Sequence, residues 1–364
     1  MYYFFLGNTP DLSFLELKSI FAGEFMPLQT GINTYAGEFS LAQCERLGGT
    51  RKVASSLAIV APADLETKLI ELVLADGAKN VAVTRYVPES LVTLSLKNLK
   101  TEVMKTRSIR LVSMDLNEHE LLMLAHQHVS EFNLLPSGEE IMIAKTVWIY
   151  DAEDWVARDR AKPYRDIKRG MLPPKVARIM VNLATQGKSG LTLADPFCGT
   201  GTVLSEAMLL GYHVVGGDIN PDAVSGAESN LAWLLSGRPV TPLPSYSITL
   251  TDASHFSHPV DCIATEPYMG PLLDERNPLP LEKIQNIARG LDKLYRGAFK
   301  SWLEVLPAGG RVVMSIPSFV VYNRIVSTIS IDTLQALGYN YLSSVTYSKP
   351  GAAVIRNITI LEKK

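Results

Sequence analysis

The sequence has few cysteines, no long apolar run and little net charge, and each absence excludes a class of protein. Only three of its 364 residues are cysteines, and they are widely spaced without a C-x-x-C pair. Neither a zinc site nor a disulfide framework is therefore expected. No uncharged apolar run reaches the ~18 residues of a membrane span, and MYYFFLG at the N-terminus lacks the basic and long apolar regions of a signal peptide. We expect a soluble, cytoplasmic protein.

The sequence also lacks an internal repeat, a low-complexity tract and a pattern of metal ligands. Its six histidines are scattered along the chain. His126 and His128 lie two positions apart on an expected helix, so their side chains point in different directions. We therefore expect no metal site.

The length of the chain indicates several domains. A chain of 364 residues is too long for one ordinary core, and 47% apolar residues are enough to build more than one. Short apolar runs alternate with helical stretches in residues 1–55 and again in residues 56–145, as in small α+β units. Residues 146–170 are polar and charged and are expected to form a linker. The sequence MLPP then opens a proline-initiated helix that begins the last part, residues 171–364.

A strand, glycine loop, helix and second strand follow one another in residues 191–218, LTLADPFCGTGTVLSEAMLLGYHVVGGD. Asp195 ends the first strand and Asp218 ends the second. At Gly199 and Gly201 the missing side chain lets the backbone approach a ligand, and the following helix offers unpaired N–H groups. Asp218 stands where a carboxylate can bind ribose hydroxyls. The pattern predicts a site for a nucleoside cofactor.

Two details of this loop indicate which cofactor it holds. A nicotinamide fingerprint needs a third glycine at the position of Leu204, which disfavours a dehydrogenase. Asp195 precedes the glycines, where its carboxylate would repel a diphosphate and attract an ammonium or sulfonium group. S-adenosyl-L-methionine is such a ligand. A tight turn without any ligand is the structural alternative.

A third strand-end acid follows in the segment SITLTDASHF. The carboxylate of Asp252 can accept a hydrogen bond from an adenine amino group, although a turn or cap role is the alternative. A helix from Asn220 to about Leu235 separates this strand from the previous one, with Asn as its cap and Pro221 at its first position. The expected cofactor-binding residues are Asp195, Pro196, Phe197, Cys198, Gly199, Thr200, Gly201, Thr202, Asp218, Ile219, Asp252 and Ala253.

The next strand, in DCIATEPYMGP (261–271), ends where chemistry is expected. An exocyclic base amine is a poor nucleophile because its lone pair is delocalised into the ring. A site that methylates it must accept hydrogen bonds from the NH₂ group and hold the base flat, for which the ring of Tyr268 is suited. A Pro-Tyr turn that only closes the strand is the alternative. The expected catalytic residues are Thr265, Glu266, Pro267 and Tyr268.

The basic residues are clustered although the net charge is only −2. Residues 158–178 contain eight basic and two acidic residues, and residues 97–110 contain five basic and one acidic residue. Such patches can neutralise phosphates, but a charge run is often only a solvated face. Two patches outside the cofactor block favour RNA as a partner. The expected RNA-binding residues are Lys97, Lys100, Lys105, Arg107, Arg110, Arg158, Arg160, Arg165, Lys168 and Arg169.

The block from residue 191 to residue 271 resembles class I S-adenosylmethionine-dependent methyltransferases that act on amines. Their signature at this strand end is Asp or Asn, two prolines and an aromatic residue. Pro267 and Tyr268 match it, whereas Thr265 replaces the acid or amide and Glu266 replaces the first proline. Thr265 can still accept one hydrogen bond, and Glu266 could supply the acidic acceptor from one position later.

The C-terminal part of the chain agrees with such a sheet. A helical stretch from about 281 to 306 is followed by the apolar strand RVVMSIP and by two strand-like runs, NYLSSVTYS and AAVIRNITIL. The sequence KPG between those two runs predicts a hairpin. Seven strands that end in an antiparallel pair are what a class I methyltransferase sheet would show.

The upstream segments resemble one family, the tRNA guanine-N2 methyltransferases that act at tRNA position 10. RDRAKPYRDIKRGMLPPKVARIMVNLA (158–184) is similar to the segment before their catalytic domain, and MYYFFLGNTPDLSFLELKSIF and RLGGTRKVA to their ferredoxin-like part. KTRSIRLVS (105–113) lies in the part that corresponds to their THUMP domain, an RNA-binding module. The resemblance implies an α/β fold with a C-terminal class I (Rossmann-like, seven-stranded) methyltransferase domain preceded by smaller α+β ferredoxin-like and THUMP-like domains. The implied boundaries are 1–55 (ferredoxin-like), 56–145 (THUMP-like, RNA-binding), 146–170 (linker) and 171–364 (methyltransferase).

The activity implied by the resemblance is transfer of a methyl group from S-adenosyl-L-methionine to the exocyclic N2 of a guanosine in tRNA, without a metal. A DNA or RNA adenine-N6 methyltransferase is one alternative. A non-catalytic tRNA-binding protein with a degenerate methyltransferase domain is another, motivated by Thr265 and Glu266. The sequence leaves open which nucleotide is modified, whether one or two methyl groups are added, the oligomeric state, and whether a small activating protein subunit is needed.

Overall fold

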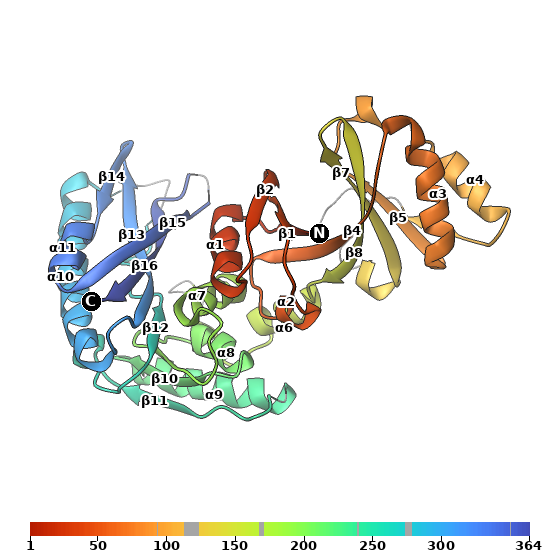
Figure 1. Cartoon of the computed structure of the whole chain (residues 1–364). Helices are drawn as coiled ribbons and strands as arrows, with labels where there is room; N and C mark the ends of the chain where they lie inside the picture. The colour runs from red at the N-terminus through yellow and green to blue at the C-terminus, as the bar shows by residue number, and fades with distance from the viewer. Residues whose placement is uncertain (93, 113–123, 167–170, 239, 274–278, 350) are drawn as a thin grey trace. The chain divides into compact units, whose positions relative to one another are not determined.

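The computed structural model describes all residues except 93, 113–123, 167–170, 239, 274–278 and 350 (Figure 1). The chain forms two compact units, and each takes residues from more than one stretch of sequence. The first unit comprises Met1–Pro10, Phe21–Glu45 and Thr50–Val156, and the second comprises Asp11–Ile20, Arg46–Gly49 and Ala157–Lys364. No helix within the described ranges is long and apolar enough to cross a membrane.

The first unit is built on one sheet of eight strands in the order β2-β3-β1-β4-β8-β7-β5-β6. Its strands are β1 (Tyr2–Leu6), β2 (Phe25–Gln29), β3 (Ile32–Tyr35), β4 (Thr50–Val60), β5 (Asn80–Arg85), β6 (Arg110–Val112), β7 (Val129–Ser137) and β8 (Glu140–Ile149). The predicted boundary at residue 55 falls inside β4, which pairs with both β1 and β8. Residues 1–55 and 56–145 therefore share one sheet.

The helices of this unit occur both before and after β4 in the sequence. They are α2 (Leu41–Cys44), α3 (Leu65–Asp76), α4 (Leu96–Met104) and α6 (Ala152–Arg160), the last of which continues into the second unit. Leu65, Leu69 and Val73 of α3 repeat at the helical spacing of four and lie in one apolar core with Phe132 and Ile143 of the sheet. The segment 146–170, predicted to be a linker, thus includes the end of β8 and the helix α6.

The second unit has the sheet order β11-β10-β9-β12-β13-β16-β15, with β14 paired to β13 outside this path. The strands from β11 to β13 are parallel, and β16 is antiparallel to both β13 and β15. The bounds are β9 (Thr192–Asp195), β10 (His213–Asp218), β11 (Tyr246–Leu250), β12 (Cys262–Thr265), β13 (Arg311–Val321), β14 (Arg324–Ser327), β15 (Tyr339–Tyr347) and β16 (Val354–Lys363). The predicted seven-stranded Rossmann-like sheet with an antiparallel end pair is confirmed, and β14 is an addition that was not predicted.

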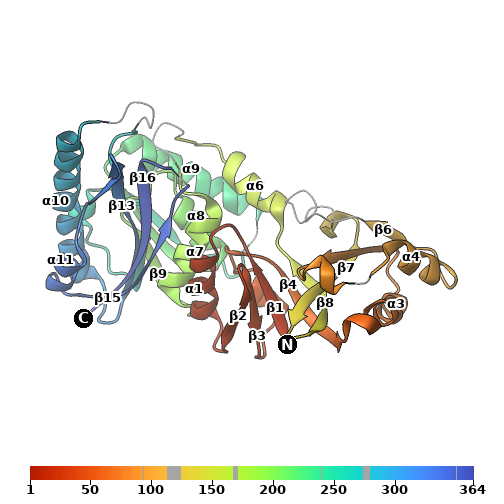
Figure 2. The same cartoon turned by 90° about the horizontal axis from the view of Figure 1, so that it is seen from above.

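Helices lie on both faces of this sheet (Figures 1 and 2). They are α1 (Pro10–Ile20), α7 (Pro174–Thr185), α8 (Thr202–Leu209), α9 (Pro221–Gly237), α10 (Leu281–Val305) and α11 (Ile331–Ala336). In α10 the buried residues Ile284, Ala288, Leu291 and Tyr295 recur every three or four positions, so one face of the helix packs on the sheet. Asn220 caps α9 by accepting a hydrogen bond from the Asp222 N–H, as predicted.

A buried carboxylate fastens α1 to the rest of the second unit. Glu16 accepts hydrogen bonds of 2.8 Å from the N–H groups of Gly48 and Gly49 and one of 2.7 Å from the Asn182 amide on α7. Burial raises the pKa of Glu16 to about 6, against the lowering effect of these donors. Two short N-terminal segments are thus built into the same unit as the C-terminal sheet.

Candidate active site

Three strand ends meet at one edge of the second sheet. Asp195 ends β9, Asp218 ends the neighbouring β10, and Thr265 ends β12 on the other side of β9. Because these strands are parallel, their carboxyl ends lie at the same edge, which is where ligands bind in open α/β sheets. The structure therefore brings the predicted cofactor and amine residues together at one edge.

The glycine loop has the backbone that the sequence predicts. Gly199 and Gly201 have φ angles of 50° and 74°, a region that favours glycine. A Cβ atom on Gly199 would meet only the Phe197 carbonyl oxygen, at 3.9 Å, so this stretch of backbone is open to a ligand. A Cβ atom on Gly201 would lie 3.2 Å from the Cβ of Ala227 on α9. Gly199 thus leaves space for a ligand, whereas Gly201 allows helix packing.

Leu204 shows why this loop differs from a dinucleotide site. The residue is fully buried, and its side chain would lie 2.7 Å from a Cβ atom placed on Gly216 of β10. The glycine that lets the helix approach the sheet is therefore on the strand and not in the loop. This geometry accounts for the absence of the third glycine of a nicotinamide fingerprint.

Asp195 is a buried acid that accepts hydrogen bonds from two neighbouring groups. Its Oδ1 accepts bonds from the Phe197 N–H at 3.1 Å and from the Thr265 hydroxyl at 2.6 Å, and its exposed fraction is 2%. Burial raises the pKa of Asp195 to about 7, and the nearby carboxylates of Asp218 and Glu266 act in the same direction. A cationic ligand at this edge would stabilise the ionised form.

Asp218 connects the second strand to the glycine loop. Its Oδ2 accepts a hydrogen bond from the Gly199 N–H at 3.0 Å, and its Oδ1 accepts one from the Asn220 N–H at 2.9 Å. A carboxylate has about four acceptor positions, so ribose hydroxyls can still bind to it. Ile219, which follows it, is 72% exposed and offers an apolar surface for a flat ring.

Asp252 caps the short 3₁₀ helix η3 (Ala253–His255). Its Oδ1 accepts bonds of 2.7 Å from the backbone N–H and from the hydroxyl of Ser254, and these bonds lower its pKa. This is the cap role named as the alternative, and binding to adenine stays a prediction. In the loop, Cys198 is 4% exposed and burial raises the pKa of its thiol, so a non-reactive packing role suits it.

The amine corner, residues 265–268, is held by partners that lie far away in the sequence. Thr265 is fully buried and donates its hydroxyl to Asp195. Glu266 Oε1 accepts a bond of 2.7 Å from Nε of Arg356 on β16, in an ion pair whose side chains are 15% and 29% exposed. The Tyr295 hydroxyl of α10 donates to the Tyr268 carbonyl oxygen at 2.7 Å. Pro267 is buried, and Tyr268 is 56% exposed.

The predicted RNA-binding residues of the first unit fall into two groups. Lys97, Lys100 and Arg110 are exposed, and Lys105 is exposed and paired with Glu102 at 2.7 Å. The guanidinium of Arg107 instead donates to the Ala78 and Val73 carbonyl oxygens at the C-terminal end of α3. Arg107 therefore has a capping role, and phosphate binding by the others stays a prediction.

Several basic residues of the patch at residues 158–178 are buried around one acidic residue. Arg158 and Arg178 both bind Glu206 of α8, and the three side chains are at most 6% exposed. Lys162 Nζ lies 3.2 Å from the Thr200 hydroxyl and 3.0 Å from the Thr202 hydroxyl. A phosphate at Arg158 would have to displace Glu206. Arg160 and Arg165 are exposed, whereas Lys168 and Arg169 lie outside the described residues.

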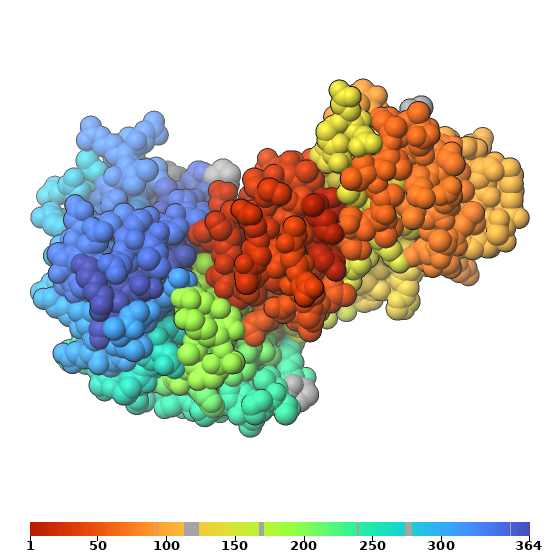
Figure 3. Space-filling view, viewed as in Figure 1, coloured from red at the N-terminus to blue at the C-terminus, as the bar shows by residue number. Residues whose placement is uncertain are grey.

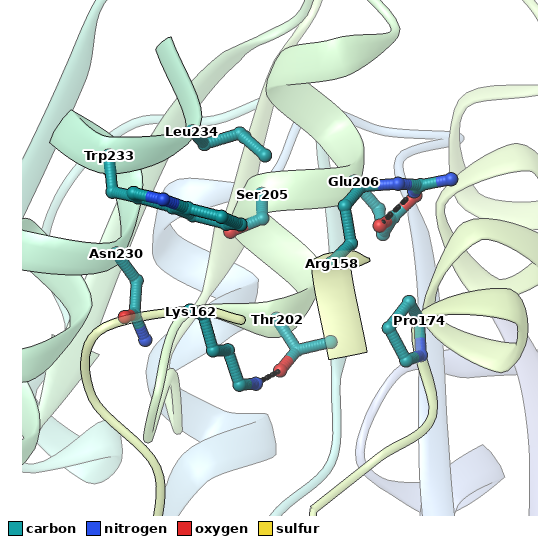
Figure 4. A pocket seen from close by; sticks show the side chains of 9 residues that line it. All are labelled: Arg158, Lys162, Pro174, Thr202, Ser205, Glu206, Asn230, Trp233 and Leu234. Carbon is teal, nitrogen blue, oxygen red and sulfur yellow. Dashed lines mark hydrogen bonds and ion pairs between the residues drawn. The ribbon is translucent and has the colours of Figure 1, made fainter. Parts of the chain in front are cut away.

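Four of the residues around this cluster, Arg158, Lys162, Thr202 and Glu206, line a small cavity at the start of α8 (Figure 4). Its volume of about 10 Å³ is enough for about one water molecule. The cavity is therefore too small for a nucleoside cofactor, and its residues fasten the segment before α7 to the loop. Across the described ranges, no group of three or more His, Cys, Asp or Glu side chains is arranged to hold a metal ion.

Comparison with known proteins gives a matching family. Residues 162–318 match the family described as RMKL-like, methyltransferase domain. Among curated proteins, the tRNA (guanine(10)-N2)-dimethyltransferase of Methanothermobacter thermautotrophicus is 32% identical over 45% of this chain and 43% of its own length. The enzyme of the same name from Pyrococcus abyssi is 29% identical over 53% of this chain and 50% of its own length. The matches thus span about half the length of these relatives.

The comparison with solved structures includes a match over the whole chain. The crystal structure of TrmN from Thermus thermophilus covers 100% of both chains with a TM-score of 0.50 and 20% identity, a likeness that concerns the fold. The resemblance seen in the sequence is confirmed by the curated relatives. Residues 162–318 are therefore similar to the RMKL-like methyltransferase domain, and about half of the chain is similar to tRNA (guanine(10)-N2)-dimethyltransferases.

Proposed function

We propose that this protein methylates the exocyclic N2 of a guanosine in tRNA, with S-adenosyl-L-methionine as the methyl donor. The observation that carries the proposal is the placement of the Glu266 carboxylate at the corner after β12, one residue after Thr265, whose hydroxyl binds the strand-end acid Asp195. Two domain-level likenesses, to the RMKL-like family and to the curated tRNA enzymes, support the same reaction class.

The residues of the first two strand ends suit this cofactor. The open backbone at Gly199 can accept a close ligand, and the Asp195 carboxylate suits the positively charged methionine end. Asp218 would bind the ribose, and the exposed Ile219 would pack on the adenine. When bound, the cofactor supplies a methyl group that its sulfonium already activates. Positioning by the protein should therefore supply most of the rate.

Glu266 is the acceptor best suited to the amine. Thr265 already donates its hydroxyl to Asp195, whereas Arg356 bonds only Oε1 of Glu266 in the geometry described above. We assign Oε2 of Glu266 as the acceptor for the base, with the Pro267 backbone beside it and the ring of Tyr268 stacked on the base. A carboxylate that accepts from N2 keeps electron density on that nitrogen and orients its lone pair.

The same carboxylate favours guanine over adenine. The Watson–Crick edge of guanine presents two neighbouring donors, N1–H and N2–H₂. The N2 amine would donate to Oε2, and N1–H to the second acceptor position of Oε1, beside the bond from Arg356. Adenine presents an acceptor, N1, beside its amine, and this acceptor would be repelled. Glu266 therefore argues against the adenine-N6 alternative, and an intact set of strand-end acids argues against a degenerate domain. A tRNA substrate would also agree with a cytoplasmic location.

The test is transfer from isotopically labelled cofactor to tRNA and to duplex DNA, followed by mass spectrometry of the nucleosides. We expect N2-methylguanosine or N2,N2-dimethylguanosine from tRNA and no label in DNA. Glu266→Gln should lower kcat by roughly 100-fold, a typical effect of removing one transition-state partner, without changing the affinity for the cofactor. Methylated adenine, or tRNA binding without turnover in the presence or absence of a candidate activating subunit, would reject the proposal.

A further inference from the structure

We propose that the tip of the β13–β14 hairpin is a contact site for an unpaired nucleotide of the RNA substrate near the target base. This inference rests on the proposed function. It concerns Tyr322 and Arg324, which the amine corner and the cofactor loop do not include. The hairpin forms a projection at the upper left of Figure 3.

The position of the hairpin follows from the strand register. Thr265, at the end of β12, pairs with Met314 of β13, and β13 continues for seven further residues to Val321. At about 3.3 Å per residue, the hairpin extends roughly 20 Å beyond the strand end that carries the amine corner. It therefore rises on the side of the sheet where the target base would enter.

The base of the hairpin is fixed against the amine corner. Phe319 is fully buried, and its ring lies 3.3 Å from where a Cβ atom on Gly270 would be, two residues after Tyr268. The Asn357 side chain of β16 donates to the Ile316 carbonyl oxygen and to the Ser318 hydroxyl, both at 3.1 Å. The tip thus projects from an anchored base.

The turn at the tip holds an exposed aromatic ring at a conformational cost. Val321 pairs with Arg324, so Tyr322 and Asn323 form a two-residue loop with φ angles of 48° and 59°. Asparagine suits this left-handed region, but a bulky residue such as tyrosine rarely adopts it, and glycine would fit better. Backbone strain of this kind is concentrated at functional positions, and Tyr322 is 68% exposed.

The chemistry of the tip fits nucleic acid. An exposed ring offers a stacking surface for a base, and the guanidinium of the exposed Arg324 can bind the neighbouring phosphate. No acidic residue occurs between Arg311 and Ile331, so the hairpin sequence itself carries only positive charge. An enzyme that takes a base out of a helix leaves the former pairing partner of that base unpaired, and such a nucleotide is the occupant we assign.

The experiment compares turn variants in the full chain. Tyr322→Gly removes the ring and relieves the backbone, so the Tm should stay the same or rise while the KM for tRNA increases five-fold or more. Tyr322→Phe keeps the ring and should stay within two-fold of the wild type. Arg324→Met should raise the KM two- to five-fold and weaken the salt dependence of binding. Ser327→Ala, an exposed change away from the tip, is the matched control.

Two outcomes overturn the inference, and a third concerns the proposed function. A Tyr322→Gly enzyme with an unchanged KM for tRNA overturns the inference, whether the tip then binds a protein or only solvent. An equal loss in Tyr322→Phe also overturns it, because stacking does not need the hydroxyl. If the wild type produces no methylated guanosine, the proposed function is wrong. Fluorescence anisotropy would then still compare tRNA binding by the wild type and the Tyr322→Gly variant, and equal affinities would overturn the inference.

Discussion

The cofactor end and the amine corner of the active-site edge are held in different ways. At the cofactor end, Asp195, Asp218 and Asp252 each accept a hydrogen bond from the N–H two residues further on. At the amine corner, Thr265, Glu266 and Tyr268 bond to partners 70, 90 and 27 positions away. The cofactor end therefore repeats one local turn, with a bond from residue i+2 to the aspartate, at three strand ends. The amine corner depends on contacts that form only when the sheet is complete.

The largest effect is expected at the cofactor end. Asp218→Ala removes the proposed ribose acceptor and the partner of the Gly199 N–H, so cofactor affinity should fall by roughly 30-fold or more, about 2 kcal/mol. Isothermal titration calorimetry with S-adenosyl-L-methionine would measure it. Asp222→Ala removes an exposed acid four residues away and should change the affinity little. Equal affinities in wild type and Asp218→Ala would mean that the ligand end of the sheet is wrongly assigned.

The next effect tests the long-range support of the amine corner. Arg356→Met should leave the Glu266 carboxylate mobile and lower kcat by roughly ten-fold, while cofactor affinity stays unchanged. Arg356→Lys retains the charge and should recover part of the loss. A positioning role also predicts that Arg356→Met adds little to Glu266→Gln in the double variant. Independent, multiplicative losses would contradict this role.

The pKa of Asp195 predicts a pH-dependent effect on the free energy of unfolding and on cofactor affinity. Its folded-state value of about 7 lies above the ordinary value of 3.8, so the folded protein holds a proton that the unfolded chain releases. The free energy of unfolding should therefore decrease as the pH rises from about 4 to 7, by at most about 1.4 kcal/mol per pH unit from this group. Urea unfolding across this range should show a flatter profile for Asp195→Asn. Cofactor affinity should rise with pH over the same window, and a slope of the opposite sign would refute the assignment.

The smallest effect distinguishes two basic residues, Lys97 and Arg107, for which the sequence predicted the same RNA-binding role. Lys97→Met should weaken tRNA binding by roughly two- to four-fold and reduce its salt dependence, because Lys97 is exposed. Arg107→Met should instead lower the Tm, because its guanidinium caps the end of α3. Anisotropy titrations at two salt concentrations and thermal unfolding of both variants would measure this contrast. A larger binding loss in Arg107→Met at unchanged Tm would reverse it.

The contrast between local and long-range contacts explains how much of the structure could be predicted from the sequence. The glycine loop, the cap at Asn220 and the final hairpin depend on neighbouring residues, so their residue types reveal them. The Arg356 partner of Glu266 could not be predicted, because it comes from a strand that joins the sheet 90 residues later. The burial of Arg158 was missed for a similar reason, since a charge pattern does not show that Glu206 is buried beside it. For β14, the asparagine at 323 was the available turn signal.

The position of Glu16 has a consequence for any shortened form of the protein. A chain that starts at residue 157 would contain the whole C-terminal sheet but would lack α1 and the Gly48–Gly49 pair. The amide of Asn182 would lose its buried acceptor, and apolar side chains of α7 that pack near Leu12 would meet water. Such a fragment should aggregate or unfold more readily than the full chain. Its failure to transfer a methyl group would then report damaged folding and not a missing RNA-binding region.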